Sequence, residues 1–299
     1  MALAVAFSFL AAIGFSTGYV LIRIAVQHVS APTATFFNVF TGAVLVLALA
    51  LALDFGEVKA LPPVAFAWFA LMGIMAYPLA RVLVNTAITM VGAARAAPAN
   101  SLQPVIALAL AIPILGERPN LIILAGTPMV VIGLILVVMS SGGNEAALRV
   151  VRINKLGYLL AIAAAAIFAS RDVISRHVVA GIAPPLVTAG FALAIGGSVL
   201  LALIHRDVVS SLRRVPLRYI GICGLAGVCQ GLAVTFLFQA LSRAPVTVVS
   251  PINASSPLIT LLLTHLFLRR LESINPLLVV GACLGVAGVV TVVLGTVAG

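Results

Sequence analysis

The feature that most constrains this chain is a succession of apolar runs, each long enough to cross a lipid bilayer. The hydrocarbon core of a bilayer is about 30 Å thick, so a helix that spans it needs about 20 apolar residues. Hydrophobic residues make up 63% of the chain and charged residues only 8%, too few to cover a water-soluble domain. The sequence therefore predicts an all-α integral membrane protein with ten transmembrane helices. Their approximate limits are 2–27, 33–53, 63–88, 93–115, 120–140, 156–179, 184–204, 216–240, 245–268 and 275–297.

The distribution of basic residues predicts the orientation of these helices. The net charge is +10, but the basic residues stand singly or in pairs between apolar runs, which is not the pattern of a nucleic-acid-binding patch. Of the 17 Lys and Arg residues, eleven lie toward one side of the membrane, four toward the other, and Arg81 and Arg171 lie inside helices. The richer side is expected to be cytoplasmic, which places both termini outside the cytoplasm. The eleven are Arg23, Arg95, Arg149, Arg152, Lys155, Arg206, Arg213, Arg214, Arg218, Arg269 and Arg270, and the four are Lys59, Arg118, Arg176 and Arg243.

The second half of the sequence repeats the first. When the chain is shifted by 153 residues, a P-x-N-x-x-x-P element at 98–104 falls on the same element at 251–257. Two extra residues near 269–270 change the shift to 155, and Glu117 then falls on Glu272. So many coincidences in one register strongly support an internal repeat, even in a composition this biased. The other matched pairs are Phe15 and Phe168, Val20 and Val173, Arg23 and Arg176, Pro32 and Pro185, Thr35 and Thr188, Pro63 and Pro216, Ala87 and Ala240, Asn120 and Asn275, Gly126 and Gly281, and Gly133 and Gly288.

Each half contains five predicted helices. Because five is an odd number, the second half enters the membrane from the opposite side. The prediction is therefore two inverted five-helix repeats, over residues 1–141 and 156–299. Inverted repeats are typical of secondary transporters, whose substrate site lies near the bilayer midplane between the repeats.

The doubled motifs resemble those of EamA-type transporters in the drug/metabolite transporter superfamily. The resemblance covers essentially the whole chain and rests on three features. These are segment 15–23 with its counterpart 168–176, the Pro- and Asn-containing fourth and ninth helices, and Gly116-Glu117 followed by Gly126 and Gly133. The resemblance implies a secondary transporter, and specifically an exporter, of small metabolites such as amino acids. It also implies location in the cell (inner or plasma) membrane and alternating access around a central cavity.

Three positions depart from the pattern of that family. Phe15 and Phe168 stand where the family often has Trp, and Asn38 stands where it often has Arg. The resemblance further implies that the first, third, fourth, sixth, eighth and ninth helices line the cavity. The expected partners are the lipid bilayer and a small-molecule substrate, with protons as a candidate coupling ion and no nucleic acid.

The sequence contains no recognisable enzyme motif. There is no P-loop, no H-E-x-x-H zinc motif and no G-x-S-x-G nucleophile motif. Cys223 and Cys229 are six residues apart, about 240° around a helix, which does not make a metal pair. We therefore expect no catalytic residues, no metal site and no cofactor. Three alternatives stay open: an uncoupled facilitator or channel for small solutes, a membrane-embedded enzyme, and a non-transporting assembly subunit.

Polar residues inside the third helix are candidates for a substrate site. A polar group in hydrocarbon is costly and usually faces a bundle interior or a water-filled cavity. Tyr77, Arg81 and Asn85 are four residues apart and would share one stripe of an α-helix. The alternative for Arg81 is a side chain that extends to a lipid headgroup. The continued stripe favours a cavity wall.

The fourth and ninth helices carry further candidates beside their prolines. Asn100 and Gln103 share a face of the fourth helix, and Asn253 and Ser256 share a face of the ninth. The prolines remove backbone hydrogen bonds, and broken helices often line transporter sites. The alternative is that the two asparagines bind freed carbonyl groups or neighbouring helices. Two more substrate-binding candidates are Gln230 and Ser170.

Asp172 is the one carboxylate of seven that lies deep inside a predicted helix. One hypothesis is that it couples transport to protons, because burial favours the neutral form of a carboxylate. The other is a structural role, in which an arginine keeps Asp172 charged. That arginine is Arg176, one turn later, as an in-helix ion pair, or else Arg171 or Arg81. Glu117 and Glu272 precede the fifth and tenth helices. A negative charge there complements a helix N-terminus, so both are predicted to be structural.

Overall fold

The described part of the chain is helical. The computed structural model describes residues 1–91, 96, 99, 101–141, 155–212, 215–267 and 276–298. Within these ranges every regular element is a helix and no strand is present. This follows from the apolar sequence, because a backbone in lipid must satisfy its own N–H and C=O groups, and a helix does so within one segment.

The helices follow the predicted apolar runs closely. The helices of the first half are α1 (Ala2–Ala25), α2 (Ala31–Leu53), α3 (Phe55–Lys59), α4 (Pro63–Ile74), the π-helix η1 (Met75–Ala80), α5 (Arg81–Val91), α7 (Gln103–Leu115) and α8 (Leu121–Ser141). The helices of the second half are α9 (Lys155–Gly181), α10 (Pro185–Leu212), α11 (Leu217–Leu241), α12 (Val246–Asn253), α13 (Ser256–Phe267) and α14 (Pro276–Ala298).

The prediction of ten transmembrane helices is met only in part. Among the described residues, nine helices are long and apolar enough to cross a membrane. Two of these nine are composite, one built from α4, η1 and α5 and the other from α12 and α13. The predicted helix 93–115 is represented by the shorter apolar helix α7, which has 13 residues. Within the described ranges, the structure therefore shows nine membrane-length helices and, at the place of the fourth predicted helix, the shorter α7.

Some residues named above lie outside the described part of the chain, so the structure does not test them. The prediction of membrane orientation draws on several of these, and it stays a prediction. They are Arg95, Pro98, Asn100, Arg149, Arg152, Arg213, Arg214, Arg269, Arg270, Glu272 and Asn275.

Two membrane helices are interrupted where the sequence places prolines. Pro78 lies inside η1. Proline has no N–H to donate and its ring displaces the carbonyl group four residues earlier, and the wider π-turn accommodates both effects. In the ninth helix, α12 ends at Asn253 and α13 begins at Ser256. Pro257 follows in the first turn of α13, where a missing N–H is tolerated, so the predicted interruption of this helix is observed.

The described residues form two compact units, and each combines segments from both halves of the sequence. The first unit contains Leu79–Val173 and Ala244–Gly299 together with Met1. The second unit contains Ala2–Pro78 and Ile174–Arg243. The compact units therefore differ from the two sequence repeats, whose boundaries at 1–141 and 156–299 stay a prediction.

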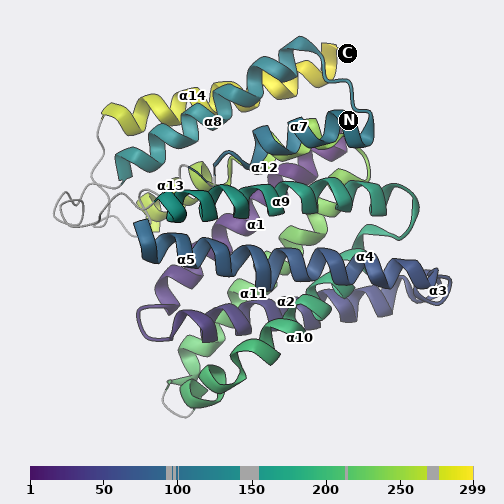
Figure 1. Ribbon diagram of the computed structural model, residues 1–299, viewed down its shortest axis with the longest axis vertical. Helices are drawn as coiled ribbons and strands as arrows, with labels where there is room; N and C mark the ends of the chain where they lie inside the picture. The colour runs from purple at the N-terminus through teal and green to yellow at the C-terminus, as the bar shows by residue number, and fades with distance from the viewer. Residues whose placement is uncertain are drawn as a thin grey trace. The chain divides into compact units, whose positions relative to one another are not determined.

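In the first unit, α8 and α14 run side by side with their backbones in contact (Figure 1). A Cβ atom added at Gly126 would lie 2.9 Å from the carbonyl oxygen of Gly288. One added at Gly133 would lie 2.7 Å from the carbonyl oxygen of Gly281. In the repeat register Gly126 matches Gly281 and Gly133 matches Gly288, so the contacts are reciprocal. Two helices that are related by a two-fold axis make reciprocal contacts of this kind.

In the second unit, glycines bring α2 against α11 and α4 against α10. A Cβ atom added at Gly42 would lie 2.7 Å from the carbonyl oxygen of Gly227. One added at Gly73 would lie 2.9 Å from the amide nitrogen of Gly196. Small residues at such contacts allow membrane helices to approach closely, since lipid supplies little hydrophobic driving force between them.

The apolar core of the second unit lies between α4, α9 and α10. The ring of Phe69, which is fully buried, stacks on Phe191 with ring centroids 5.6 Å apart. The hydroxyl group of Ser175 on α9 donates a hydrogen bond to the sulfur atom of Met72, at 3.2 Å. This contact gives the buried hydroxyl a partner inside the core, as buried polar groups require.

Candidate functional site

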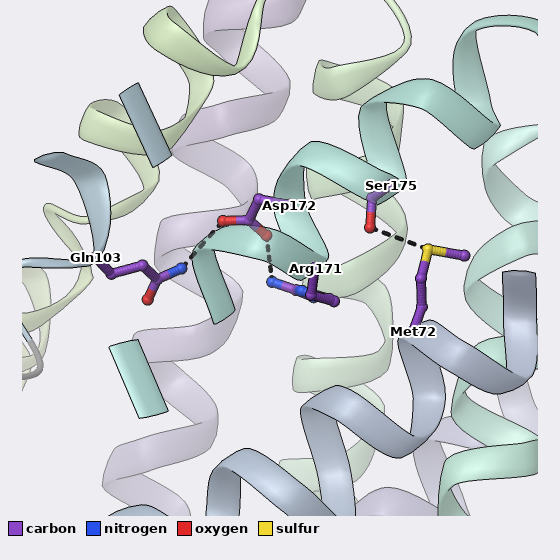
Figure 2. A network of polar contacts seen from close by, with 5 residues as sticks. All are labelled: Met72, Gln103, Arg171, Asp172 and Ser175. Carbon is purple, nitrogen blue, oxygen red and sulfur yellow. Dashed lines mark hydrogen bonds and ion pairs between the residues drawn. The ribbon is translucent and has the colours of Figure 1, made fainter. Parts of the chain in front are cut away.

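Asp172 on α9 has the most deeply buried charged side chain among the described residues, at 2% exposure. Its Oδ1 accepts a hydrogen bond from Nη2 of Arg171 at 2.5 Å. Its Oδ2 accepts one from Nε2 of Gln103, the first residue of α7, at 3.0 Å. Figure 2 shows the carboxylate between these two donors. We call these three residues the Asp172 cluster.

Arg171 and Asp172 lie inside α9, which is long enough to cross a membrane, so the balance of their two charges is important. An isolated charge in a low-dielectric interior is very costly, and buried charges are paired or neutralised. The Arg171 guanidinium balances the charge of Asp172, and the Gln103 amide supplies a second hydrogen bond. A proton on Asp172 would remove the charge that holds both donors. Both hydrogen bonds would then be weaker, because a neutral carboxyl group is a weaker acceptor than a carboxylate.

Of the arginines considered as partners of Asp172, the pairing with Arg176 is wrong and Arg171 is the one observed. Arg176 instead donates a hydrogen bond from Nη1 to the carbonyl oxygen of Leu241, at the C-terminal end of α11. A positive charge is favourable there because the helix dipole is negative at that end. Asp172 pairs with its immediate neighbour Arg171, although neighbouring side chains on a helix usually point in different directions. The length of the arginine side chain makes this pair possible.

The predicted stripe of Tyr77, Arg81 and Asn85 crosses the π-helix. Tyr77 lies inside η1 and is 8% exposed. Its ring packs on α10, where a Cβ atom added at Gly196 would lie 2.5 Å from Cδ2 of the ring. Arg81 begins α5 and is half-buried, whereas Asn85 is exposed. The three side chains therefore do not share one environment, since Tyr77 is buried, Arg81 is half-buried and Asn85 is exposed.

The break in the ninth helix gives its two candidate residues different surroundings. Pro257 has no N–H to donate to the carbonyl oxygen of Asn253, and Oγ of Ser256 donates to that oxygen at 2.6 Å. Ser256 therefore satisfies the carbonyl group freed by the proline. The side-chain Oδ1 of Asn253 is buried and has no hydrogen-bond partner among the described residues. The Asn253 amide thus stays a candidate for binding a ligand.

The second unit contains two buried side-chain amides, and the sequence pointed to only one of them as a candidate site residue. Gln230 on α11 is 6% exposed and packs on α1, where a Cβ atom added at Gly18 would lie 2.9 Å from its Nε2. Asn38 on α2 is 3% exposed, and its Nδ2 has no hydrogen-bond partner among the described residues. The sequence predicts Gln230 as a site residue, whereas Asn38 is noted above only as a departure from the family pattern and not as a candidate. The sequence feature that could have identified Asn38 as a candidate is a single amide side chain in an otherwise apolar run.

The structure brings some of the predicted site residues together and separates others. Gln103 and Asp172 are in contact, and Asn253 and Ser256 lie at one helix break. Ser170 donates a hydrogen bond to the carbonyl oxygen of Ala166, at 2.8 Å, on its own helix. The candidates in the first unit are Arg81, Asn85, Gln103, Ser170, Asp172, Asn253 and Ser256, those in the second are Tyr77 and Gln230, and Asn100 lies outside the described residues.

Glu117 complements a helix N-terminus, as predicted, but a different one. The fifth membrane helix, α8, is capped by Asn120, whose Oδ1 accepts a hydrogen bond from the N–H of Ile123 at 3.0 Å. The carboxylate of Glu117 accepts hydrogen bonds from the N–H groups of Val246 at 2.7 Å and Thr247 at 2.9 Å. These residues begin α12. Glu117 therefore links the end of the fourth predicted helix to the start of the ninth.

Comparison with known families agrees with the motifs found in the sequence. The sequence matches the EamA-like transporter family twice, over residues 2–139 and 155–294. The chain belongs to the EamA-like transporter family. The resemblance drawn from the doubled motifs is thereby confirmed, and the family is a family of transporters.

The fold of this EamA-like protein is also found among solved structures. One of them, described only as "Crystal structure of protein", has a TM-score of 0.79 and 22% sequence identity to this chain. The likeness covers 97% of this chain and 96% of that one. At this identity the likeness shows the fold alone. No curated protein matches the sequence.

Family membership and helix composition together establish the broad class of the protein. The nine membrane-length helices in the described ranges make this EamA-like protein an integral membrane protein. Its transport chemistry is therefore to be sought among the polar side chains inside these helices, of which the Asp172 cluster is the most completely connected.

Proposed function

We propose that this EamA-like protein is a secondary transporter that exports small metabolites such as amino acids across the cell (inner or plasma) membrane. It works by alternating access around a central cavity. The observation that carries the proposal is the Asp172 cluster, a buried ion pair hydrogen-bonded to a second helix in a member of a transporter family. Ionisable residues inside membrane helices are costly and commonly mark the path of a substrate or an ion.

Asp172 is the proposed proton-coupling residue. In its charged form it holds Arg171 on one oxygen and Gln103 on the other. When it binds a proton, both donors lose a charged acceptor, and the hydrogen bond between α7 and α9 becomes weaker. Binding and release of a proton are thereby linked to a change in how these two helices are joined.

An uncoupled facilitator is the second candidate function. The observation that favours it is the completeness of the cluster, because Arg171 and Gln103 together satisfy both oxygens of a charged Asp172. If that charge persists through the transport cycle, the cluster is structural and transport follows the substrate gradient alone. A coupled transporter accumulates substrate against its concentration gradient, and an uncoupled facilitator does not.

Reconstituted protein distinguishes the coupled and uncoupled functions. Uptake of a mixture of radiolabelled proteinogenic amino acids into proteoliposomes would be measured with an acidic or a neutral lumen. An exporter driven by an inward proton gradient exchanges protons for substrate, so an acidic lumen should accelerate uptake. Asp172→Asn should lose this acceleration and still bind substrate, measured as a ligand-induced rise in Tm.

The matched control for this variant is Glu57→Gln, which neutralises an exposed carboxylate on α3. It should retain the gradient-driven uptake of the wild type. Wild-type uptake that is indifferent to the pH of the lumen indicates the facilitator. A folded Asp172→Asn protein with full gradient-driven accumulation excludes Asp172 as the coupling group.

The proposed orientation has both termini outside the cytoplasm, on the basis of the eleven basic residues on one side and four on the other. A C-terminal fusion to a reporter that is active only in the cytoplasm should stay silent. A strong reporter signal would reverse the proposed orientation.

A further inference from the structure

Glu117 is placed by the way in which α7 ends. α7 ends at Leu115 and is capped by Gly116, whose backbone has a φ of 67°, a left-handed conformation that glycine adopts at little cost. The N–H of Gly116 donates a hydrogen bond to the carbonyl oxygen of Ala111, which completes the last turn of the helix. The residue that follows this turn is Glu117, and its carboxylate reaches the start of α12.

The first turn of α12 depends on that carboxylate. α12 follows Pro245, which has no N–H. The N–H groups of Val246 and Thr247 donate to Glu117, and that of Val248 donates to the carbonyl oxygen of Pro245 at 3.1 Å. Val246 is 0% exposed and Thr247 is 2% exposed. The first N–H groups of a helix have no partner within the helix. If the Glu117 carboxylate were removed, the buried N–H groups of Val246 and Thr247 would therefore lose their hydrogen-bond acceptor.

The other end of α12 carries the candidate site residue Asn253. α12 has eight residues, so it is about 12 Å long, and all seven residues before Asn253 are buried. A short, buried helix moves as one body, so a shift at its first turn reaches Asn253. We infer that Glu117 is a positioning residue, which holds α12 so that the Asn253 amide keeps its place at the break before Ser256. This inference rests on the proposed function.

Hydrogen–deuterium exchange tests the cap without any substrate. Purified full-length wild type would be compared with Glu117→Ala and Glu117→Gln in detergent. Exchange of the amides at 246–253 should rise roughly fivefold in Glu117→Ala, the size of change that follows removal of a helix cap. The rise should be smaller in Glu117→Gln, because its amide oxygen still accepts one hydrogen bond. Peptides from α8 should be unchanged in both variants.

The control for the exchange experiment is Glu57→Gln, which should leave the peptides of α12 and α8 as they are in the wild type. Glu117→Asp retains the charge on a shorter side chain and provides a milder variant if Glu117→Ala does not fold. Unchanged exchange at 246–253 in every folded Glu117 variant would overturn the inference.

A thiol at position 253 reports on the far end of α12. Asn253→Cys would be introduced after Cys223, Cys229 and Cys283 are replaced by serine. The rate of reaction with a small water-soluble methanethiosulfonate reagent should rise when Glu117→Gln is added and should not change with Glu57→Gln. Equal rates in all three backgrounds would overturn the positioning role, even if exchange in the first turn increases.

Transport separates this inference from the proposed function. With the best-transported amino acid of the radiolabelled panel, Glu117→Gln should raise KM more than it lowers kcat, and Glu117→Asp should partly restore KM. A fall in kcat with KM unchanged indicates a merely structural residue and contradicts the inference. If wild-type protein transports none of the panel, the proposed function fails, and the exchange and thiol measurements still decide whether Glu117 positions α12.

Discussion

Two regions of the first unit hold their helices together in different ways. In the α8–α14 pair, glycines place backbone against backbone, and an added Cβ atom would lie within 3 Å of the facing helix at Gly126 and at Gly133. In the Asp172 cluster, α9 is joined to α7 through side chains that carry a titratable group. A close-packed contact has one arrangement because neither backbone can give way. In the proposed mechanism, the ion pair with its hydrogen-bonded amide has two arrangements, which differ by one proton.

This difference assigns separate tasks to the two regions in the proposed mechanism. The α8–α14 pair is a rigid support, which explains why glycine occurs at matched positions in both repeats. In that mechanism the Asp172 cluster is the part that changes, and both oxygens of its buried carboxylate have hydrogen-bond donors. Changes in the two regions should therefore have different consequences.

The largest effect is expected when the Arg171 guanidinium is removed. Arg171→Met leaves the buried Asp172 carboxylate without its opposite charge, and breaking a buried ion pair in this way typically costs about 3–5 kcal/mol. The Tm of the purified protein should fall sharply. Arg171→Met combined with Asp172→Asn removes the unbalanced charge and should recover most of the loss. A single variant as stable as the wild type would show that Arg171 does not balance Asp172.

A smaller loss of stability is expected when a side chain is forced between α8 and α14. The added Cβ atom of Gly133→Leu would lie 2.6 Å from Cα of Gly285, and overpacking of this kind typically costs about 1–3 kcal/mol. The matched control is Gly221→Leu on α11, where an added Cβ atom meets nothing within 4 Å. Thermal unfolding should show a lower Tm for the first variant alone. Equal Tm values would mean that the glycine contacts are not close-packed.

The smallest effect is expected at the edge of the Asp172 cluster. Gln103→Leu removes one hydrogen bond to a charged acceptor and refills most of the volume, which should cost about 1.5 kcal/mol. Gln27→Leu, at an exposed glutamine in the turn after α1, is the control. In thermal unfolding, the Tm of Gln103→Leu should lie between the Tm of this control and that of Arg171→Met. A Tm below that of Arg171→Met would mean that the amide, rather than the guanidinium, holds the carboxylate.

The sequence predicted the membrane helices well because insertion depends on the summed hydrophobicity of one segment. The predicted run 2–27 corresponds to α1 (Ala2–Ala25), and the predicted run 275–297 corresponds to α14 (Pro276–Ala298). The proline elements also predicted the break in the ninth helix. These features are local, so they can be read from composition and short patterns.

Contacts between helices were harder to predict because they depend on packing. The in-helix ion pair considered for Asp172 was with Arg176, one turn away, yet its partners are an adjacent residue and Gln103, 69 residues earlier in the chain. Glu117 was expected to complement α8, yet its partners lie 129 and 130 residues later. In each case the type of residue indicated that it would take part in a polar contact. The partner depended on which helices pack together, and the sequence does not show this directly.

The role of Asp172 is tested most directly by proton movement that accompanies substrate movement. Proteoliposomes loaded with a pH-sensitive dye would receive the radiolabelled amino-acid mixture with no imposed pH gradient. With wild-type protein, the lumen should become more alkaline as amino acids enter, because protons leave in exchange. Asp172→Asn should give no change in pH. The coupling role would be contradicted by a constant lumen pH while wild-type protein transports amino acids, or by an Asp172→Asn protein that moves protons as well as the wild type.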